Sequence, residues 1–276
     1  MRFLRRPFPW RRVLSLLVLG MAGLGLWLIY QLSFPARSSA LAGTPYVLRV
    51  QPGVPNYDVR LVTEGLRFAD RYFWQVLGLT TKEPIDVKLA RFSPCIPFLP
   101  LRRSPSAVAD RNELCINTVY QAWPQARRER ALAVSIVAHE HFHNVQGQLN
   151  CLPRRGEHEY AWWVEGSATY LGWRATLHAR LVTRADIHRR MLAWGERNPD
   201  LRPLREYERA IQGDAAYALA ARAVEDLVRR SGSERSLATF CQRVGQGVPW
   251  ATAFEGAFGL AVGDFYTQFE RQRMAR

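Results

Sequence analysis

Residues 131–144 read ALAVSIVAHEHFHN, and the interpretation of the rest of the chain depends on this stretch. Residues 131–138 are small or apolar apart from Ser135, so we expect a buried helix here. The second half contains His139-Glu140-x-x-His143. Residues four apart lie on one face of a helix, so both imidazoles can reach a single ion. The stretch therefore predicts a rigid helix that presents two metal ligands at a cleft.

Zinc is the metal that this spacing indicates. Histidine binds zinc at ~2.0–2.1 Å, and a catalytic zinc site adds a third protein ligand and leaves one position for water. Glu165 is our candidate for the third ligand, because it lies in the apolar stretch WWVEGSATY (residues 162–170), where an unpaired carboxylate would be costly. Glu140 is placed to contact a zinc-bound water without binding the metal, as a general base would. We expect one zinc ion per chain, held by His139, His143 and Glu165.

Other residues of these two helices have both a structural and a functional interpretation. His141 lies two positions from each motif histidine and points away from them, so we expect it to be structural or solvent-facing. Asn144 and Gln148 either orient the metal-binding histidines or are ordinary polar surface residues. We expect Trp162 and Trp163 to pack in the core rather than to bind substrate.

Strand patterns come first along the chain and helical patterns follow. We expect strands at 46–50, 85–92 and 113–119, with a helix at 58–77 between the first two. Later helices are predicted at 126–149, 157–180, 184–196, 214–231, 234–245, 249–257 and 262–273. This order predicts a single α+β domain, with a small sheet before the motif helix and a helical C-terminal half.

The N-terminal segment predicts a membrane anchor. Residues 13–32 carry no charge, and their length is close to the ~20 residues that a transmembrane helix needs. The preceding arginines favour a cytoplasmic N-terminus and an extracytoplasmic body, periplasmic or extracellular. We therefore divide the chain into a cytoplasmic stub and anchor (1–33), a linker (34–44) and the folded domain (45–276). The alternative is a signal peptide cleaved at Ala40-Leu41-Ala42; both interpretations export the body.

Export changes how the four cysteines are interpreted. Cysteines in an oxidising compartment form disulfides, and four of them allow three connectivities. We favour Cys95 with Cys115 and Cys151 with Cys241; the alternative is four buried free thiols.

The positive charge of the chain does not by itself indicate a nucleic-acid partner. Lys and Arg number 38 against 24 Asp and Glu, which gives a net charge of +14. The arginines are scattered, and no recognised nucleic-acid-binding motif accompanies them. We expect an ordinary solvated surface and no nucleic acid, while the oligomeric state stays open.

The two segments that carry the proposed ligands resemble those of the gluzincins, zinc peptidases with H-E-x-x-H on one helix and a glutamate ligand on the next. The chain is more closely similar to the small peptidase MA-like domains, in which a W-x-x-E-G-x-A helix follows the motif, here Trp162 to Ala168. The stretch from Ala216 to Leu260, with Phe265 and Phe269, resembles the tail of those domains. The resemblance spans about residues 58–269, and the connection between the two helices is slightly longer than in thermolysin-like enzymes.

This resemblance implies a zincin-like domain with an antiparallel-edged sheet against the motif helix. By analogy, 113–119 is the sheet edge to which an extended peptide could add. The resemblance also implies that His139, His143 and Glu165 bind zinc, that Glu140 is the base, and that the reaction hydrolyses bonds in peptide or protein substrates. Tyr217 matches a tyrosine of the family's tail and is our first candidate to stabilise the oxyanion; the alternatives are a core tyrosine, or His158 in this role. The competing function is a non-catalytic, zinc-stabilised envelope scaffold. We favour the enzyme, because a scaffold needs no base beside its ligands.

Overall fold

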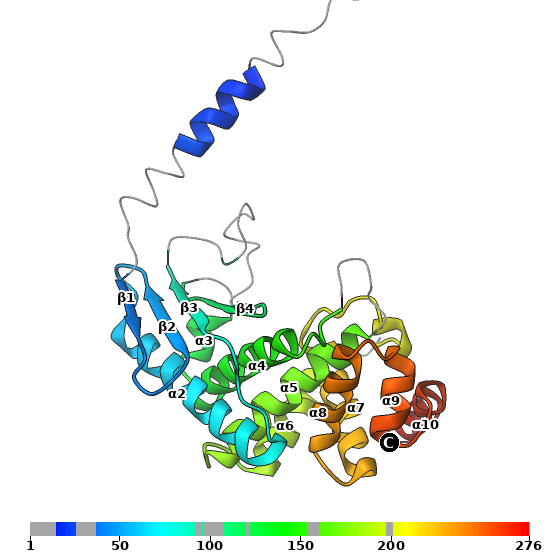
Figure 1. The fold of residues 1–276 in the computed structure, drawn as a ribbon. Helices are drawn as coiled ribbons and strands as arrows, with labels where there is room; N and C mark the ends of the chain where they lie inside the picture. The colour runs from blue at the N-terminus through cyan, green and yellow to red at the C-terminus, as the bar shows by residue number, and fades with distance from the viewer. Residues whose placement is uncertain are drawn as a thin grey trace, which may run out of the picture.

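The structure is a computed structural model (Figure 1), and it describes residues 15–25, 37–91, 95, 107–119, 122–153, 160–196 and 201–275. The predicted α+β class is confirmed, since strands dominate the first part of the domain and helices the remainder. Figure 1 shows the sheet at one end of the domain and helices α9 and α10 at the other, with α4 and α5 between them.

One mixed sheet forms the N-terminal part of the domain. Its strands are β1 (Arg37–Ala40), β2 (Tyr46–Val50), β3 (Ile85–Ala90), β4 (Ala107–Ala109) and β5 (Glu113–Asn117). Their order is β1-β2-β3-β5-β4, in which β2, β3 and β5 are parallel and the two edge strands are antiparallel. The antiparallel edges agree with the resemblance described above.

The edges of the sheet differ from the prediction. β1 lies inside the segment 34–44 assigned to a linker, and β4 lies between the strands predicted at 85–92 and 113–119, where no strand was predicted. The prediction that 113–119 forms the sheet edge is wrong, because β5 pairs with β3 on one side and with β4 on the other. The ladder hydrogen bonds of β5 are therefore already used, and the short strand β4 is the edge.

Two helices cover the sheet and share its core. The helix predicted at 58–77 is observed as α2 (Asn56–Tyr72), which continues as a π-helical turn, η1 (Phe73–Leu77). The motif helix is α4 (Arg130–Gln148). Apolar side chains of α2, α4 and the strands form one buried cluster, which includes Leu61, Val62, Leu66, Val87, Leu89, Ile116, Ala133 and Val137. The apolar half of α4 is buried as predicted, which holds its histidine-bearing turns in place.

Helices make up most of the remaining chain. The helices predicted after residue 124 are observed, with some ends shifted by a few residues, and two short turns, α3 (Trp123–Ala126) and η3 (Leu204–Tyr207), are additional. The longer helices are α5 (Ala161–His178), α6 (Arg184–Glu196), α7 (Asp214–Ser231), α8 (Arg235–Gly245), α9 (Trp250–Phe258) and α10 (Val262–Met274). Trp162 and Trp163 are fully buried in the core that these helices share, as predicted.

Both predicted disulfides are confirmed. Cys95 pairs with Cys115 of β5, and Cys151 pairs with Cys241 of α8. The second bridge joins the chain just beyond the motif helix to a helix near the C-terminus. Such cross-links stabilise a fold mainly by restricting the unfolded chain.

The predicted membrane anchor lies partly outside the described residues. Residues 15–25 are helical, whereas residues 13–14 and 26–32 are not described. In the part of the chain that the structure describes, no helix combines the length and the hydropathy that a membrane span requires. Ala40, in the alternative cleavage site, is the last residue of β1 and pairs with Val47, so cleavage there would remove this strand.

Candidate metal centre

Two glycines let the helices around the motif approach one another closely. A Cβ atom added to Gly172 of α5 would lie 2.5 Å from the carbonyl oxygen of Ser135 in α4. A Cβ atom added to Gly166 of α5 would lie 2.7 Å from the carbonyl oxygen of Ala220 in α7. Any larger residue would push these backbones apart. Side chains from α4, α5 and α7 can therefore converge on one place.

The three predicted ligands converge there. The Nε2 atoms of His139 and His143 are 3.1 Å apart, and Glu165 Oε2 lies 3.2 Å from the first and 3.3 Å from the second. Two ligands at ~2.0–2.1 Å from a tetrahedral zinc ion are about 3.3 Å apart. The three atoms thus form a nearly equilateral triangle of the size that one zinc ion requires. Together these residues could hold a metal ion.

The charges in this triangle require a cation. Burial lowers the pKa of His143, but the Glu165 and Glu140 carboxylates and the contact with Gln146 together outweigh burial and raise that pKa to about 9. Burial also favours the neutral form of Glu165, yet the imidazoles of His143 and His139 hold the pKa of its carboxyl well below the usual range. A proton or a metal ion must supply positive charge between these atoms, and the triangular spacing fits a metal.

Glu140 lies beside the ligands and is 9% exposed. Burial raises the pKa of its carboxyl, the two motif imidazoles oppose this shift, and the nearby Glu165 carboxylate reinforces it. Among the described residues, no side chain or backbone group is hydrogen bonded to the carboxylate of Glu140. A carboxylate this deeply buried usually has such a partner. Its carboxylate is therefore available to a molecule that enters the site.

Tyr217 also reaches the site, from α7. Its ring centroid is 6.1 Å from that of His139. Burial raises the pKa of its hydroxyl, and the carboxylates of Glu165 and Glu140 add to this effect, so Tyr217 keeps its proton at neutral pH. It can therefore donate a hydrogen bond. The alternative candidate, His158, lies outside the described residues.

Two residues that contact the ligand imidazoles were not predicted. Gln146 Oε1 lies 2.7 Å from Nδ1 of His143, and Thr169 Oγ1 lies 3.2 Å from Nδ1 of His139. Partners of this kind commonly orient a metal-bound imidazole. Helical spacing could have indicated both, because Gln146 follows His143 by about one turn and Thr169 follows Glu165 by about one turn.

Asn144 and Gln148, which were considered as residues that orient the metal-binding histidines, have other partners. Asn144 Nδ2 donates to the carbonyl oxygen of Glu113, at 2.8 Å, and so ties α4 to β5. Gln148 Oε1 accepts from the backbone N–H of Lys82, at 2.7 Å. In the described part of the chain, neither side chain is hydrogen bonded to a ligand imidazole. Both are structural residues, and their contacts hold the motif helix against the sheet and its loops.

His141 has the structural position predicted for it, and it is fully buried. Its Nε2 atom lies 2.9 Å from Asp70 Oδ1 and 3.0 Å from the hydroxyl of Tyr46, which in turn donates to Asp70 Oδ1 at 2.6 Å. These contacts connect α4 to α2 and β2. We refer to His141, Asp70 and Tyr46 as the buried cluster.

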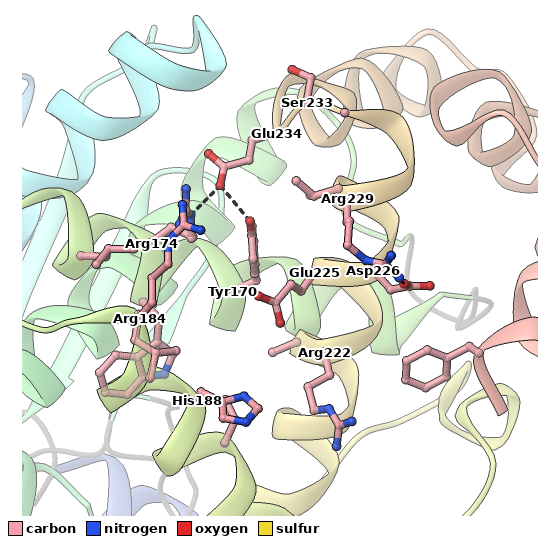
Figure 2. Close-up of a pocket in the computed structure, with 18 of the residues that line it drawn as sticks. Tyr170, Arg174, Arg184, His188, Arg222, Glu225, Asp226, Arg229, Ser233 and Glu234 are labelled. Atoms are coloured by element: carbon pink, nitrogen blue, oxygen red, sulfur yellow. Dashed lines mark hydrogen bonds and ion pairs between the residues drawn. The ribbon is translucent and has the colours of Figure 1, made fainter. Parts of the chain in front are cut away.

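A separate cavity of about 850 Å³ opens between α5, α6 and α7 (Figure 2). None of the predicted site residues lines it. Its charged groups largely satisfy one another: Glu234 accepts hydrogen bonds from Arg174 and Tyr170, and Asp226 pairs with Arg229. Figure 2 shows Arg174 and Tyr170 both directed at Glu234. This network joins α5 to the start of α8 and lacks the converging ligands of the metal centre.

The comparisons with known proteins concern the fold. No protein-family model matches the sequence, and no curated protein matches it. An M1 zinc metallopeptidase from Deinococcus radiodurans is similar in structure at 17% identity and a TM-score of 0.48, over 86% of this chain and 50% of that one. A mutant of a two-domain M1 zinc metallopeptidase bound to L-arginine matches at 17% identity and a TM-score of 0.47, over 86% and 51%.

A mutant of a two-domain M1 zinc metallopeptidase bound to L-tryptophan matches at 14% identity and a TM-score of 0.45, over 86% of this chain and 50% of that one. The chain thus spans about half the length of each of these enzymes. Independently of these matches, His139, His143 and Glu165 are arranged as the H-E-x-x-H and glutamate pattern predicts, and they could hold a metal ion.

Proposed function

We propose that this chain is a zinc-dependent peptidase of the gluzincin type, which hydrolyses bonds in peptide or protein substrates. The observation that carries the proposal is the triangle of ligand atoms, with sides of 3.1, 3.2 and 3.3 Å, on two adjoining helices. Nitrogen and carboxylate donors in this number are those of catalytic zinc sites, which keep one position open.

The residues present fit a zinc ion. His139 and His143 would bind it through Nε2 and Glu165 through Oε2. When bound, zinc supplies a Lewis acid that activates water and polarises the scissile carbonyl. Glu140 takes the proton of the attacking water and passes it to the leaving amine. The lack of a hydrogen-bond partner for Glu140 among the described residues supports this role.

Tyr217 is proposed to stabilise the oxyanion. Its hydroxyl stays protonated because burial and two neighbouring carboxylates raise its pKa. A protonated phenol beside the ligands can donate a hydrogen bond to the oxygen on which negative charge develops. Its approach depends on Gly166, which allows α7 to contact the helix that carries Glu165.

A non-catalytic zinc-stabilised scaffold is the competing function. Such a module would need the three ligands alone, and a closed structural site normally has four protein ligands. The three-ligand group and the nearly buried carboxylate of Glu140 both favour the enzyme.

We also propose that residues 13–32 anchor the chain in a membrane, with the peptidase domain on the extracytoplasmic side. The uncharged sequence of this segment and the arginines before it support the anchor and its orientation. The two disulfides support an oxidising compartment for the domain.

The test is a hydrolysis assay of the purified chain on a mixture of unstructured peptides. We expect cleavage that a chelator abolishes and that added zinc restores, with about one zinc per chain by elemental analysis. Glu140→Gln is the control for a contaminating peptidase. Zinc binding without cleavage of any peptide would favour the scaffold, and absence of zinc would contradict both functions.

A further inference from the structure

We propose that Gln146 is a positioning residue, which fixes the imidazole of His143 and the turn that carries Glu165 as a single unit. This inference rests on the proposed zinc site. Gln146 is fully buried on α4, and its amide group contacts both helices that supply ligands. Its oxygen faces His143, at 2.7 Å, while its nitrogen faces α5.

The partners on α5 determine which way the amide is turned. Gln146 Nε2 lies 3.2 Å from the carbonyl oxygen of Val164 and 3.1 Å from Ser167 Oγ. The Ser167 hydroxyl itself donates to the Val164 carbonyl, at 3.1 Å. Since a carbonyl oxygen can only accept, the NH₂ group must face α5. The amide oxygen is therefore the atom that faces His143.

The amide in turn determines the tautomer of His143. An amide oxygen accepts hydrogen bonds and cannot donate them, so Nδ1 of His143 must carry a proton. In the neutral imidazole the other nitrogen, Nε2, then has its lone pair free. Nε2 is the atom that lies 3.1 Å from His139 Nε2 and 3.3 Å from Glu165 Oε2. Gln146 thus keeps His143 in the form that can bind a metal.

The same side chain fixes the position of the third ligand. Val164 directly precedes Glu165, and Ser167 follows it by two residues, so both α5 partners of Gln146 belong to the turn that carries this carboxylate. Thr169 does not duplicate this function at His139, because a hydroxyl can donate or accept and so leaves the tautomer undetermined. We therefore expect Gln146 to contribute more to zinc binding than Thr169 does.

The experiment compares the zinc affinity of Gln146→Met with that of Gln148→Met, measured by competition with a chromophoric chelator. Gln148 lies on the same helix, and its hydrogen bonds go to loop residues such as Lys82. We expect Gln146→Met to weaken zinc binding by about 10- to 100-fold, as for other partners of metal-bound histidines. Gln148→Met should stay within about twofold of the wild type, because it leaves these partners in place.

Two further readouts separate positioning from packing. Gln146→Glu keeps an acceptor for Nδ1 of His143 and should bind zinc more tightly than Gln146→Met. In ¹⁵N-histidine spectra of the zinc-loaded protein, the Nδ1–H proton of His143 should be protected from exchange in the wild type and lost in Gln146→Met. Equal zinc affinity in the two methionine variants, or equal loss in Gln146→Met and Gln146→Glu, would overturn the proposal.

A third variant keeps the test decisive if Gln146→Met does not fold. Ser167→Ala removes one partner of the amide with little change in volume and should weaken zinc binding several-fold; wild-type affinity in Ser167→Ala would overturn the proposal. A wild-type chain that binds no zinc would contradict the proposed function itself. Wild-type zinc binding with an unaffected Gln146→Met contradicts the positioning role alone.

Discussion

The two faces of α4 each contribute to a cluster of histidine and carboxylate, and the two clusters differ in how many potential metal ligands they bring together. On one face, His139, His143 and Glu165 bring lone pairs and a negative charge together. On the other face, His141 contacts Asp70 and Tyr46, and the Tyr46 hydroxyl donates to the Asp70 carboxylate. In the first cluster three potential metal ligands converge, whereas in the buried cluster a single imidazole nitrogen meets a carboxylate and a hydroxyl donor.

This comparison shows what distinguishes a metal centre from a structural histidine on the same helix. The imidazoles of both clusters are largely buried, since the side chains of His139 and His143 are 15% and 10% exposed and that of His141 is fully buried, while the carboxylates of Glu165 and Asp70 are 26% and 32% exposed. Burial therefore does not separate them. The number and spacing of the ligand atoms do, because only the first cluster brings three of them close enough to bind one ion.

The sharpest test of this contrast replaces the histidines one at a time. We expect His143→Ala to lose the bound zinc almost completely, and with it all hydrolysis, because two ligands cannot hold the ion tightly. His141→Ala should retain about one zinc per chain. Elemental analysis of the purified variants makes the measurement; similar zinc content in both would show that the two faces do not differ as we infer.

Glu140→Gln tests whether hydrolysis can be lost while zinc binding is retained. The amide has nearly the same shape but cannot accept the proton of the attacking water, so we expect turnover to fall by about 10²- to 10⁴-fold. Zinc content should remain that of the wild type, because Glu140 is not among the ligands. Steady-state kinetics on a cleaved peptide provides the measurement, and undiminished turnover would refute the assignment of the base.

Tyr217→Phe tests the residue that α7 contributes. Loss of one oxyanion donor typically costs about 10²- to 10³-fold in turnover. We expect such a loss in kcat with little change in KM or zinc content, since the hydroxyl acts on charge that develops during the reaction. A variant with unchanged kcat would make Tyr217 a packing residue.

The smallest effect is expected for a substitution in the buried cluster. Tyr46→Phe removes the hydroxyl from the buried cluster and should lower the free energy of unfolding by about 1–2 kcal/mol, as for a buried hydrogen bond left without a partner. Zinc affinity should not change. Urea unfolding of the zinc-free protein measures the loss, and Tyr57→Phe is the matched control, because Tyr57 is 44% exposed. Equal stability of both variants would mean that the cluster contributes little.

Much of the fold could be predicted from the sequence, because its signals are local. The apolar alternation of residues 85–90 and the helical spacing of 58–77 lie within single elements, and both are observed. β1 and β4 have no such signal. Arg37–Ala40 is polar and exposed, and Ala107–Ala109 is a three-residue segment, so each is a strand only because a neighbouring strand offers free backbone groups.

The metal centre was predictable to the extent that it depends on helical spacing. His139 and His143 could be predicted as ligands because they lie one helical turn apart, and Glu165 because a carboxylate in apolar surroundings needs a partner. The orientation of the Gln146 side-chain amide could not be predicted, because it depends on the carbonyl of Val164 in another helix. The same holds for the position of the buried cluster, whose members come from β2, α2 and α4.

The bridge from Cys151 to Cys241 has a consequence for how the centre assembles. Glu165, Gly166 and Tyr217 all lie between the two bridged cysteines, and Cys151 follows shortly after His143. In the oxidised unfolded chain, the segments that bear these groups remain in one covalent ring and so stay near the histidines. Oxidation would thus favour assembly of the site although neither sulfur atom contributes to it, so formation of the candidate metal centre would depend on the redox state of the compartment.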